Sequence, residues 1–404
     1  MADAKFRVYG YRWVVLAVFM LINLTIQMLW IGYAPITGPA AQFFHVSDGQ
    51  IGLLAMIFML VFLPLSIPVS WVIDTYGFHV AVGIGAALMA VFGVVRGLAG
   101  ADYNLVVWST VGLAVAQPFM MNAWTKVPAN WFSIRERATA VGLVTLSSLM
   151  GIALGMALTP ILMDGGMSIP SIQLLYGGVA AVSSVLFIVL ARERPATPPC
   201  PPGMEVRALM LDGFKHALTV KPFWMYLFVM FVGMGIFNGI TTWVETIIRP
   251  RGFTPTDAGT AGALMLLGGV IGAAVLPSFS DRQHKRVRYL LLGVLLAIPW
   301  LFGVAFATGP VWLFVSAFAL GFFLISISPI GMQYAAEITQ PTPEGTSNGL
   351  IQLAGQLSVV FVYIMEVLKQ PDGSYTPGLL LGVALLVVCA LVITRMPDPA
   401  PHPA

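Results

Sequence analysis

Residues 191–203, ARERPATPPCPPG, interrupt a chain that is otherwise almost continuously apolar. Six apolar stretches precede this proline- and charge-rich segment, and six follow it. Each is about 20 to 28 residues long, enough for an α-helix to cross the ~30 Å hydrocarbon core of a bilayer. The predicted spans are 13–36, 50–73, 78–98, 104–127, 136–162, 171–192, 222–249, 257–279, 288–308, 310–334, 345–368 and 376–395. We therefore predict an all-α membrane protein with 12 transmembrane helices and a central linker.

The composition supports a membrane protein and excludes a soluble one. Hydrophobic residues make up 58% of the chain and charged residues 9%, whereas soluble domains carry about 25% charged residues. The net charge of +3 is small, and the charged residues lie mainly in the predicted loops. The charge is therefore no evidence for nucleic-acid binding.

The positive charges predict the orientation of the chain. Of the 20 Lys and Arg residues, only Arg96, Arg249, Arg251 and Lys369 fall in loops or span ends on one face. Because cytoplasmic loops carry the excess of Lys and Arg, the other face, with both termini, is predicted to be cytoplasmic. Short termini and a short central loop favour a bacterial inner (plasma) membrane. Cys200 would then lie in the cytoplasmic linker.

An internal repeat divides the chain into two halves. TAVGLVTL at 139–146 and TSNGLIQL at 346–353 share Thr, Gly, Leu and Leu at the same spacing. Asp48 precedes Pro68 by the same number of residues as Asp257 precedes Pro277. Repeats at one common offset indicate a duplicated six-helix unit. The predicted domains are an N-terminal six-helix bundle at 1–192, a cytoplasmic linker at 193–221 and a C-terminal six-helix bundle at 222–404. Two parallel repeats of this kind resemble the fold of the major facilitator superfamily, whose members are secondary transporters.

The loops after the second and eighth spans strengthen this resemblance. They contain Asp74-Thr75-Tyr76-Gly77 and Ser280-Asp281-Arg282, similar to the acidic-then-basic loop of the superfamily, although the first copy lacks its basic residues. A carboxylate at a helix end can face the positive N-terminus of another helix and hold one side shut. The predicted gating residues are Asp74, Asp281, Arg135 and Arg137, with the segment from Pro343 to Thr346 facing Asp74. The alternative is that both aspartates are ordinary solvated loop charges.

Polar side chains recur on single faces of several predicted spans. Asn23, Gln27 and Trp30 follow one another at steps of four and three residues, as do Gln117, Met121 and Trp124. This spacing places each trio on one side of a helix. Polar groups within spans are costly in hydrocarbon and usually face a bundle interior or a watery path. The alternatives are interhelical hydrogen bonds worth roughly 0.6–2 kcal/mol and, for tryptophan, core packing or interfacial anchoring.

Further candidates lie in later spans, and together they define a predicted binding set. The predicted substrate-binding residues are Asn23, Gln27, Trp30, Gln117, Met121, Trp124, Phe237, Asn238, Thr241, Trp243, Gln333, Gln352 and Gln356. Glu245 and Glu366 are predicted to make an outer vestibule attractive to cations. For Glu245 the alternative is simple neutralisation by Arg249, one turn away.

The missing residue types restrict the chemistry. No Lys or Arg lies near the middle of a predicted span, so a fixed cationic partner for an anionic substrate is lacking. Tryptophan faces and amide oxygens suit an ammonium group. The sequence contains no phosphate-binding Gly-x-x-x-x-Gly-Lys loop, no histidine spacing typical of a metal site and no nucleophile beside a base. We therefore predict no enzyme activity, no cofactor and no metal.

Several motifs narrow the resemblance to one family. These are MLWIGYAPI at 28–36, Asp74-Thr75-x-Gly77, AQPF at 116–119, Trp131-Phe132 and EGTSNGL at 344–350. They are similar to the feline leukaemia virus subgroup C receptor family of solute carriers. Members of that family carry choline and ethanolamine, haem has also been proposed, and a lysosomal branch carries pyridoxine.

The resemblance implies roles for individual residues. Trp30 matches the cation-facing tryptophan of the family, and Gln117 and Gln356 match glutamines of its fourth and eleventh helices. In the seventh helix, Asn238 stands beside Phe237 where the family places a cage tyrosine. Either Trp243 supplies the missing aromatic face, or the substrate differs.

These observations predict a secondary transporter that works by alternating access on a small organic cation or polar neutral solute, choline-like by resemblance. The expected partners are this substrate and the lipid bilayer, and the chain is predicted to be monomeric. Alternatives are a proton-coupled exporter of drugs or metabolites and an organic-anion (monocarboxylate) transporter. From another class, a non-transporting membrane receptor stays open.

Overall fold

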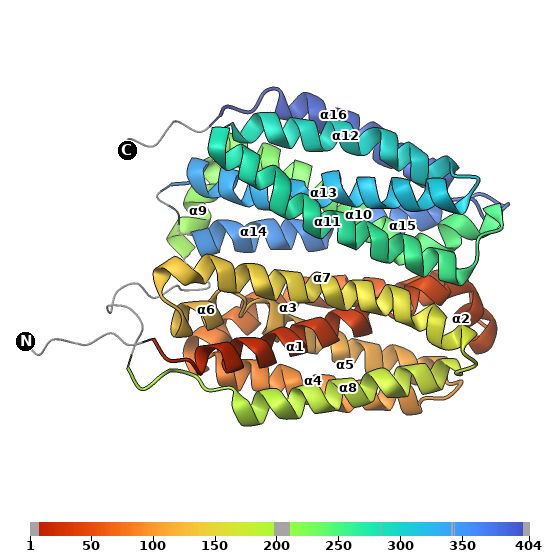
Figure 1. Ribbon diagram of the computed structural model, residues 1–404, viewed down its shortest axis with the longest axis horizontal. Coiled ribbons are helices and arrows are strands. Elements are labelled where there is room, and N and C mark those ends of the chain that lie inside the picture. The colour runs from red at the N-terminus through yellow and green to blue at the C-terminus, as the bar shows by residue number, and fades with distance from the viewer. Residues whose placement is uncertain (1–7, 198–210, 284, 341, 343, 399–404) are drawn as a thin grey trace, which may run out of the picture. The chain divides into compact units, whose positions relative to one another are not determined.

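A computed structural model describes residues 8–197, 211–283, 285–340, 342 and 344–398 of the chain. Within these residues every regular element is a helix (Figure 1). The elements are α1 (Arg12–Ile31), η1 (Ala34–Ile36), α2 (Thr37–Phe44), α3 (Asp48–Tyr76), α4 (Phe78–Leu98), α5 (Tyr103–Met121), α6 (Lys126–Trp131), α7 (Ile134–Asp164), α8 (Ile169–Leu190), α9 (Leu211–Thr219), α10 (Lys221–Ile248), η2 (Arg249–Arg251), α11 (Pro255–Gln283), α12 (Arg286–Phe306), α13 (Pro310–Ile338), α14 (Glu344–Leu357), α15 (Val359–Val367) and α16 (Thr376–Ile393). The predicted all-α class is confirmed.

Twelve segments of the described chain are long and apolar enough to cross a membrane. They are Arg12–Phe44, Asp48–Tyr76, Phe78–Leu98, Tyr103–Trp131, Glu136–Asp164, Ile169–Leu190, Lys221–Arg251, Pro255–Gln283, Arg286–Phe306, Pro310–Ile338, Gly349–Val367 and Thr376–Ile393. Each predicted span corresponds to one of these segments. Several helices run beyond their predicted ends because hydropathy marks the apolar stretch, whereas a helix continues into its polar caps.

Four of the described spans are not single continuous α-helices, and the seventh span ends with the short η2 after α10. The first consists of α1, η1 and α2, with a turn at Gly32-Tyr33 and Pro35 inside η1. The fourth is interrupted after α5, where residues 122–125 form turns before α6. The eleventh changes from α14 to α15 at Ser358. In the first span the break contains Gly32 and Pro35, residues that tolerate or impose a departure from helical geometry.

The described part of the predicted linker contains one complete regular element, α9. Residues 191–197 have no helix, and α9, a helix too short to span a membrane, occupies Leu211–Thr219. Cys200 lies outside the described residues.

Contacts divide the chain into two compact units. Unit 1 is Met1–Trp30, Val61–Gly155 and Gly165–Leu209, and unit 2 is Ile31–Leu60, Met156–Asp164 and Met210–Ala404. The division therefore does not follow the predicted bundle boundary at the linker, because residues of the first, second and fifth spans pack with the C-terminal half. The two six-helix bundles stay a prediction.

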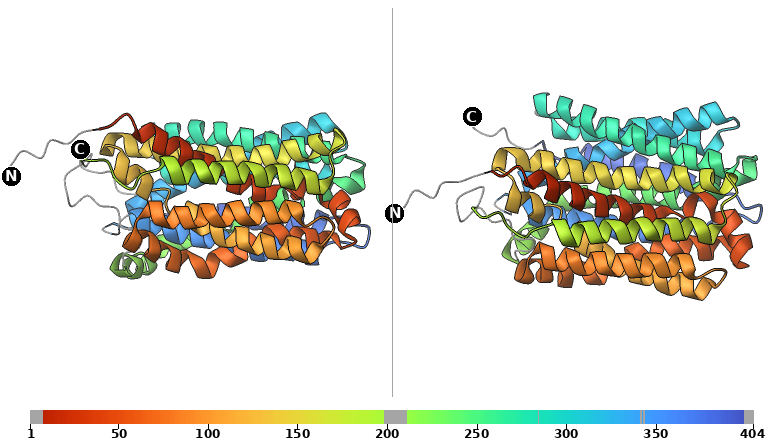
Figure 2. Two further views of the ribbon diagram at one scale, coloured as in Figure 1. Left: turned by 90° about the horizontal axis from the view of Figure 1, so that it is seen from below. Right: turned by 60° about the horizontal axis from the view of Figure 1, so that its bottom comes forward.

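Glycines allow the closest helix pairs within each unit. In unit 1, α4 lies beside α8, and Gly93 and Gly177 bring their backbones together. In unit 2, α11 lies beside α13, with Gly268, Gly272 and Gly321 against carbonyls of the facing helix (Figure 1). The two further views show that the long helices of each unit run along a common direction (Figure 2). Small residues are the usual means of close packing between membrane helices.

Candidate functional site

A cluster of amide and indole groups lies inside unit 1. We call Asn23, Gln27, Gln117 and Trp124 the amide cluster. The Trp124 indole N–H, in the turn between α5 and α6, donates to Asn23 Oδ1 at 2.6 Å. Gln117 Nε2 donates to Gln27 Oε1 at 3.2 Å. The structure thus brings together four predicted substrate-binding residues from the first and fourth spans.

One acceptor of the amide cluster is unused. The side chain of Gln117 is buried, and among the described residues its Oε1 has no hydrogen-bond partner. Leaving a buried acceptor unpaired costs about 1–3 kcal/mol. This oxygen is therefore suited to accept a hydrogen bond from a ligand.

Two further predicted residues of unit 1 lie close in sequence to the cluster. Trp30 is buried near the end of α1, one turn beyond Gln27. Met121 is half-buried at the last position of α5. Their aromatic and thioether groups extend the polar face with polarisable surface.

In unit 2, Asn238 on α10 bonds to another segment, and Thr241 bonds within its own helix. Asn238 Nδ2 donates to Ser358 Oγ at 3.0 Å, at the junction of α14 and α15. Thr241 Oγ1 donates to the Phe237 carbonyl of its own helix at 2.8 Å. Phe237 itself is buried.

Trp243 is enclosed completely, with 0% of its surface exposed. Its indole N–H donates to the Val362 carbonyl at 3.0 Å, and its ring lies 5.4 Å from that of Tyr375. The ring also fills the space beside Gly52, where a larger residue would collide with it. In this structure Trp243 packs three segments together, which is the arrangement that core packing predicts.

The three predicted glutamines of unit 2 differ in exposure. Gln333 is exposed, and its Nε2 donates to Glu337 Oε1 at 3.0 Å. Gln352 and Gln356 are half-buried on α14. Only the latter two keep the partial burial expected of a binding residue.

A charged network within unit 2 surrounds Asp48. We call Asp48, Glu245, Arg249 and Lys369 the Asp48 cluster. Arg249 forms an ion pair with Asp48, and Lys369 Nζ lies 3.1 Å from Asp48 Oδ2. Arg249 Nη1 is 3.6 Å from Glu245 Oε2, and the Gly38 N–H donates to the same oxygen at 3.1 Å.

The Asp48 cluster differs from the open, cation-attracting vestibule that the sequence predicts around Glu245. Arg249 lies beside Glu245, as the alternative to a vestibule role expects, and the Glu245 side chain is only 3% exposed. It is covered because the chain after α1 brings the N-terminus of α2 onto it. Sequence reasoning used Asp48 only as a repeat marker and missed its role. The available signal was its position at a span end on the face shared by Arg249 and Lys369.

Glu366 has a neutral hydrogen-bond donor close by. The Tyr375 hydroxyl donates to Glu366, while Lys369 pairs with Asp48 instead. Burial raises the pKa of the Tyr375 phenol above its usual value, and the hydrogen bond to Glu366 adds to this. Tyr375 is thus a neutral donor at physiological pH.

The predicted gating residues pair with cations of their own units. Asp74 Oδ1 lies 3.1 Å from Lys126 Nζ, so the start of α6 supplies the charge that the loop lacks. Asp281 pairs with Arg286, which also contacts Glu337 at 3.0 Å. Sequence reasoning missed Lys126, because it follows the turns that interrupt the fourth span.

The remaining gating candidates are only partly described. Arg137 Nη2 donates to the Ala129 carbonyl at 2.9 Å. The side chain of Arg135, the side chains of residues 344–346 and all of Pro343 lie outside the described residues.

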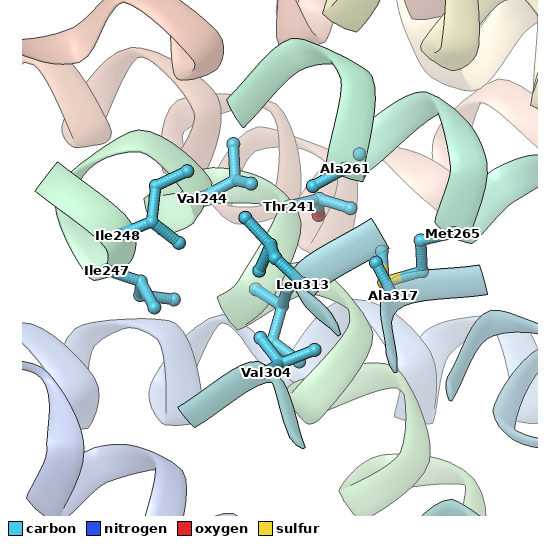
Figure 3. Close-up of a pocket in the computed structure, with 11 residues that line it drawn as sticks. Thr241, Val244, Ile247, Ile248, Ala261, Met265, Val304, Leu313 and Ala317 are labelled. Carbon is cyan, nitrogen blue, oxygen red and sulfur yellow. The ribbon is translucent and has the colours of Figure 1, made fainter. Parts of the chain in front are cut away.

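An apolar pocket in unit 2 contains one residue of the predicted set (Figure 3). It encloses about 360 Å³, including its open mouth. Its lining is Ile240, Thr241, Val244, Ile247, Ile248, Ala261, Gly262, Met265, Val304, Leu313 and Ala317. A lining without charge or amide groups offers nothing to orient a polar solute. Among the described residues there is also no group of three or more His, Cys, Asp or Glu side chains that could hold a metal ion.

Comparison with known proteins identifies the family. The model of the Major Facilitator Superfamily matches residues 14–363. The chain belongs to the major facilitator superfamily. A bacterial homologue of the human lysosomal transporter Spinster, solved in an inward-facing and unoccupied conformation, has the same fold, with a TM-score of 0.76 and 16% identity over 98% of this chain and 100% of that one.

Relatives of this major facilitator protein include solute carriers. It is 29% identical to solute carrier family 49 member A3 of Danio rerio, over 93% of this chain and 82% of that protein. It is 27% identical to the choline/ethanolamine transporter flvcr2b of Danio rerio, over 94% and 83%, and 26% identical to human choline/ethanolamine transporter FLVCR2, over 94% and 76%. The resemblance to the feline leukaemia virus subgroup C receptor family is confirmed, and the protein is a transporter of the superfamily.

Proposed function

We propose that this transporter moves a small organic cation of the choline or ethanolamine type across the membrane by alternating access. Two relatives are named as choline/ethanolamine transporters. The amide cluster supplies groups that suit such a cation. The protein acts as a carrier and not as an enzyme.

The unpartnered Oε1 of Gln117 carries the proposal. Choline has one hydrogen-bond donor, its hydroxyl, and ethanolamine adds N–H groups, so either can satisfy this buried acceptor. The faces of Trp30 and Trp124 attract a desolvated ammonium group by roughly 2 kcal/mol. No Lys or Arg occurs in residues 13–36 or 103–125, which argues against an anionic substrate.

Other predicted residues keep proposed roles. The residues of unit 2 proposed to contact the substrate are Phe237, Asn238, Thr241, Gln352 and Gln356. Trp243, which is fully enclosed, and Gln333, which is exposed, would contact it only in another conformation of the transport cycle. Asp74 and Asp281 are proposed gating residues that favour the outward-open state. The positive-inside distribution supports cytoplasmic termini. We propose a bacterial inner membrane as the location and a monomer as the acting form.

The test is transport by the purified protein in proteoliposomes. Radiolabelled choline, ethanolamine, pyridoxine and lactate are compared, and we expect saturable uptake and counterflow of the two amines. Lactate uptake without amine uptake would establish the organic-anion alternative. Amine transport that requires an opposing proton gradient would establish the proton-coupled exporter.

A matched pair of ligands tests the contact with Gln117. Tetramethylammonium has the charge of choline but no hydroxyl. Gln117→Leu should therefore weaken choline binding by about 1 kcal/mol and leave tetramethylammonium binding unchanged. An equal loss for both ligands would show that Gln117 does not accept the hydroxyl.

A further inference from the structure

We propose that Arg96 is a positioning residue for Trp30, because it binds the Leu29–Trp30 peptide group in the last turn of α1. This inference rests on the proposed function, in which the Trp30 ring contacts the substrate cation. Arg96 is not among the predicted binding or gating residues.

Arg96 is unusually placed for a charged residue. It lies in the last turn of α4, within a candidate membrane span, and only 2% of its surface is exposed. A guanidinium held at membrane depth costs several kcal/mol unless it is well paired, and such residues usually serve a function. Arg96 forms a hydrogen bond with a backbone group of another helix.

That partner is the end of α1. Arg96 Nη2 donates to the Leu29 carbonyl at 2.9 Å, and the bond is buried. Leu29 belongs to the last turn of α1, which ends at Ile31. The last four carbonyls of a helix lack intrahelical donors, and a cation there also meets the negative end of the helix dipole. Arg96 therefore caps the C-terminal end of α1, where the first span is interrupted.

A second contact holds the same spot. Gly93, one turn before Arg96 on α4, faces the Leu29 side chain, whose Cδ1 would lie 3.9 Å from a Cβ at that position. This is an ordinary van der Waals distance, and the closer neighbours of Gly93 are Gly177 and Ala180 on α8. The hydrogen bond from Arg96 to the Leu29 carbonyl is therefore the specific tie between α4 and the end of α1.

The Leu29 carbonyl and the Trp30 nitrogen belong to one planar peptide group. A hydrogen bond to this carbonyl therefore restrains the plane that holds the Trp30 nitrogen and Cα, and with it the backbone from which the ring projects. Binding of a cation by a ring depends on the ring facing it within about 6 Å. Arg96 would support this orientation through the backbone, without touching the substrate.

Arg251 provides a matched control within unit 2. Its Nη1 donates to the Val304 carbonyl at 2.9 Å and to the Ala307 carbonyl at 3.1 Å, at the end of α12. It is also an arginine on a helix C-terminus, but the carbonyls that it caps adjoin no proposed substrate residue. Loss of Arg251 should therefore match Arg96 in its effect on stability and differ in its effect on binding.

The experiment uses the full-length protein in lipid nanodiscs, labelled with 5-fluorotryptophan. The ¹⁹F resonance of Trp30 is assigned by its disappearance in Trp30→Phe, and choline affinity is measured by titration. We expect Arg96→Gln to move the Trp30 resonance and to raise the Kd for choline about 3- to 10-fold. Arg96→Lys, which keeps the charge, should restore part of the affinity. Arg251→Gln should leave both the resonance and the Kd unchanged.

A double-mutant cycle shows whether Arg96 acts through Trp30. In the Trp30→Ala background, Arg96→Gln should cause no further loss of affinity. An unmoved Trp30 resonance, or the full loss recurring without Trp30, would overturn the inference. If Arg96→Gln does not fold, Arg96→Lys carries the same two measurements. If Trp30→Ala alone leaves choline affinity unchanged, Trp30 does not contact the substrate and the proposed function loses its site. The ¹⁹F spectra of the unaltered protein and Arg96→Gln still show whether Arg96 orients the ring.

Discussion

Arg249 and Asp48, separated by 201 residues in sequence, form an ion pair within unit 2. The pair joins the end of α10 to the start of α3. Arg249 also faces the buried Glu245, so one guanidinium serves two carboxylates. The beginning of the second span is thereby tied to the C-terminal half of the chain.

Arg249→Gln should destabilise the protein more than its partly exposed position suggests. The variant leaves Glu245 buried with the Gly38 N–H as its remaining close donor, and an uncompensated buried carboxylate is costly. We expect a loss of about 1–3 kcal/mol, measured as a lower unfolding temperature in detergent. Arg288→Gln, at an exposed position, is the control. Asp48→Asn should cost less stability in the Arg249→Gln background than in the unaltered protein, and fully additive losses would argue against a direct pair.

Trp30→Ala should weaken choline binding by about 1–2 kcal/mol, because a desolvated cation would lose its aromatic partner. Binding to the purified protein measures the change directly. Trp312→Ala is the control, since that ring is 53% exposed on α13. A folded Trp30→Ala protein with unchanged affinity would contradict the proposed site.

Asp74→Asn and Asp281→Asn should each shift accessibility toward the cytoplasmic side, if the carboxylates hold that side shut. Reaction of engineered cysteines with a cytoplasmic thiol reagent reports the shift. Lys126→Gln separates two explanations for Asp74. If Asp74 acts only through its ion pair with Lys126, Lys126→Gln should increase cytoplasmic accessibility as much as Asp74→Asn does. If the Asp74 carboxylate itself closes the gate, Lys126→Gln should leave accessibility unchanged. Unchanged accessibility in both aspartate variants would remove the gate.

Transport should not require a proton gradient. The groups of the amide cluster do not titrate near neutral pH, and Glu245 is paired with Arg249. Tyr375 has a pKa raised above its usual 10.0, so its hydrogen bond to Glu366 is fully present below pH 10 and is lost only at more alkaline pH. Proteoliposomes at zero potential with an imposed pH gradient provide the measurement. Uphill accumulation that disappears in Glu245→Gln or Glu366→Gln would show coupling.

The membrane potential should drive the cation instead. An inward-moving positive charge gains about 2.3 kcal/mol per 100 mV. Choline uptake should therefore increase when a potassium gradient with valinomycin makes the vesicle interior negative. Electroneutral uptake would imply a compensating ion.

Much of the fold could be predicted, because membrane spans are a local property of the sequence. Twelve apolar segments of sufficient length define twelve spans without knowledge of their packing. The face shared by Asn23 and Gln27 followed from helical spacing alone, and the structure joins these residues to Trp124 and Gln117.

Long-range partners could not be predicted in the same way. Nothing local to Asp48 distinguishes a repeat marker from the partner of Arg249 and Lys369. Trp243 has the spacing of a polar face, yet its burial depends on Gly52 and Tyr375, far away in sequence. Which of several cations reaches a carboxylate is decided by the paths of distant segments, as Lys126 shows for Asp74.

The glycine contacts between α11 and α13 also limit which parts of unit 2 can deform. Where main chains touch directly, with Gly268 and Gly272 against α13 and Gly321 against α11, no flexible side chains remain to absorb sliding. α11 and α13 should therefore move together as one rigid body. Spin labels placed on α11 and α13 should report one narrow distance distribution that does not change through the transport cycle. The distance between these two helices can then serve as a fixed reference for measuring the movement of other helices.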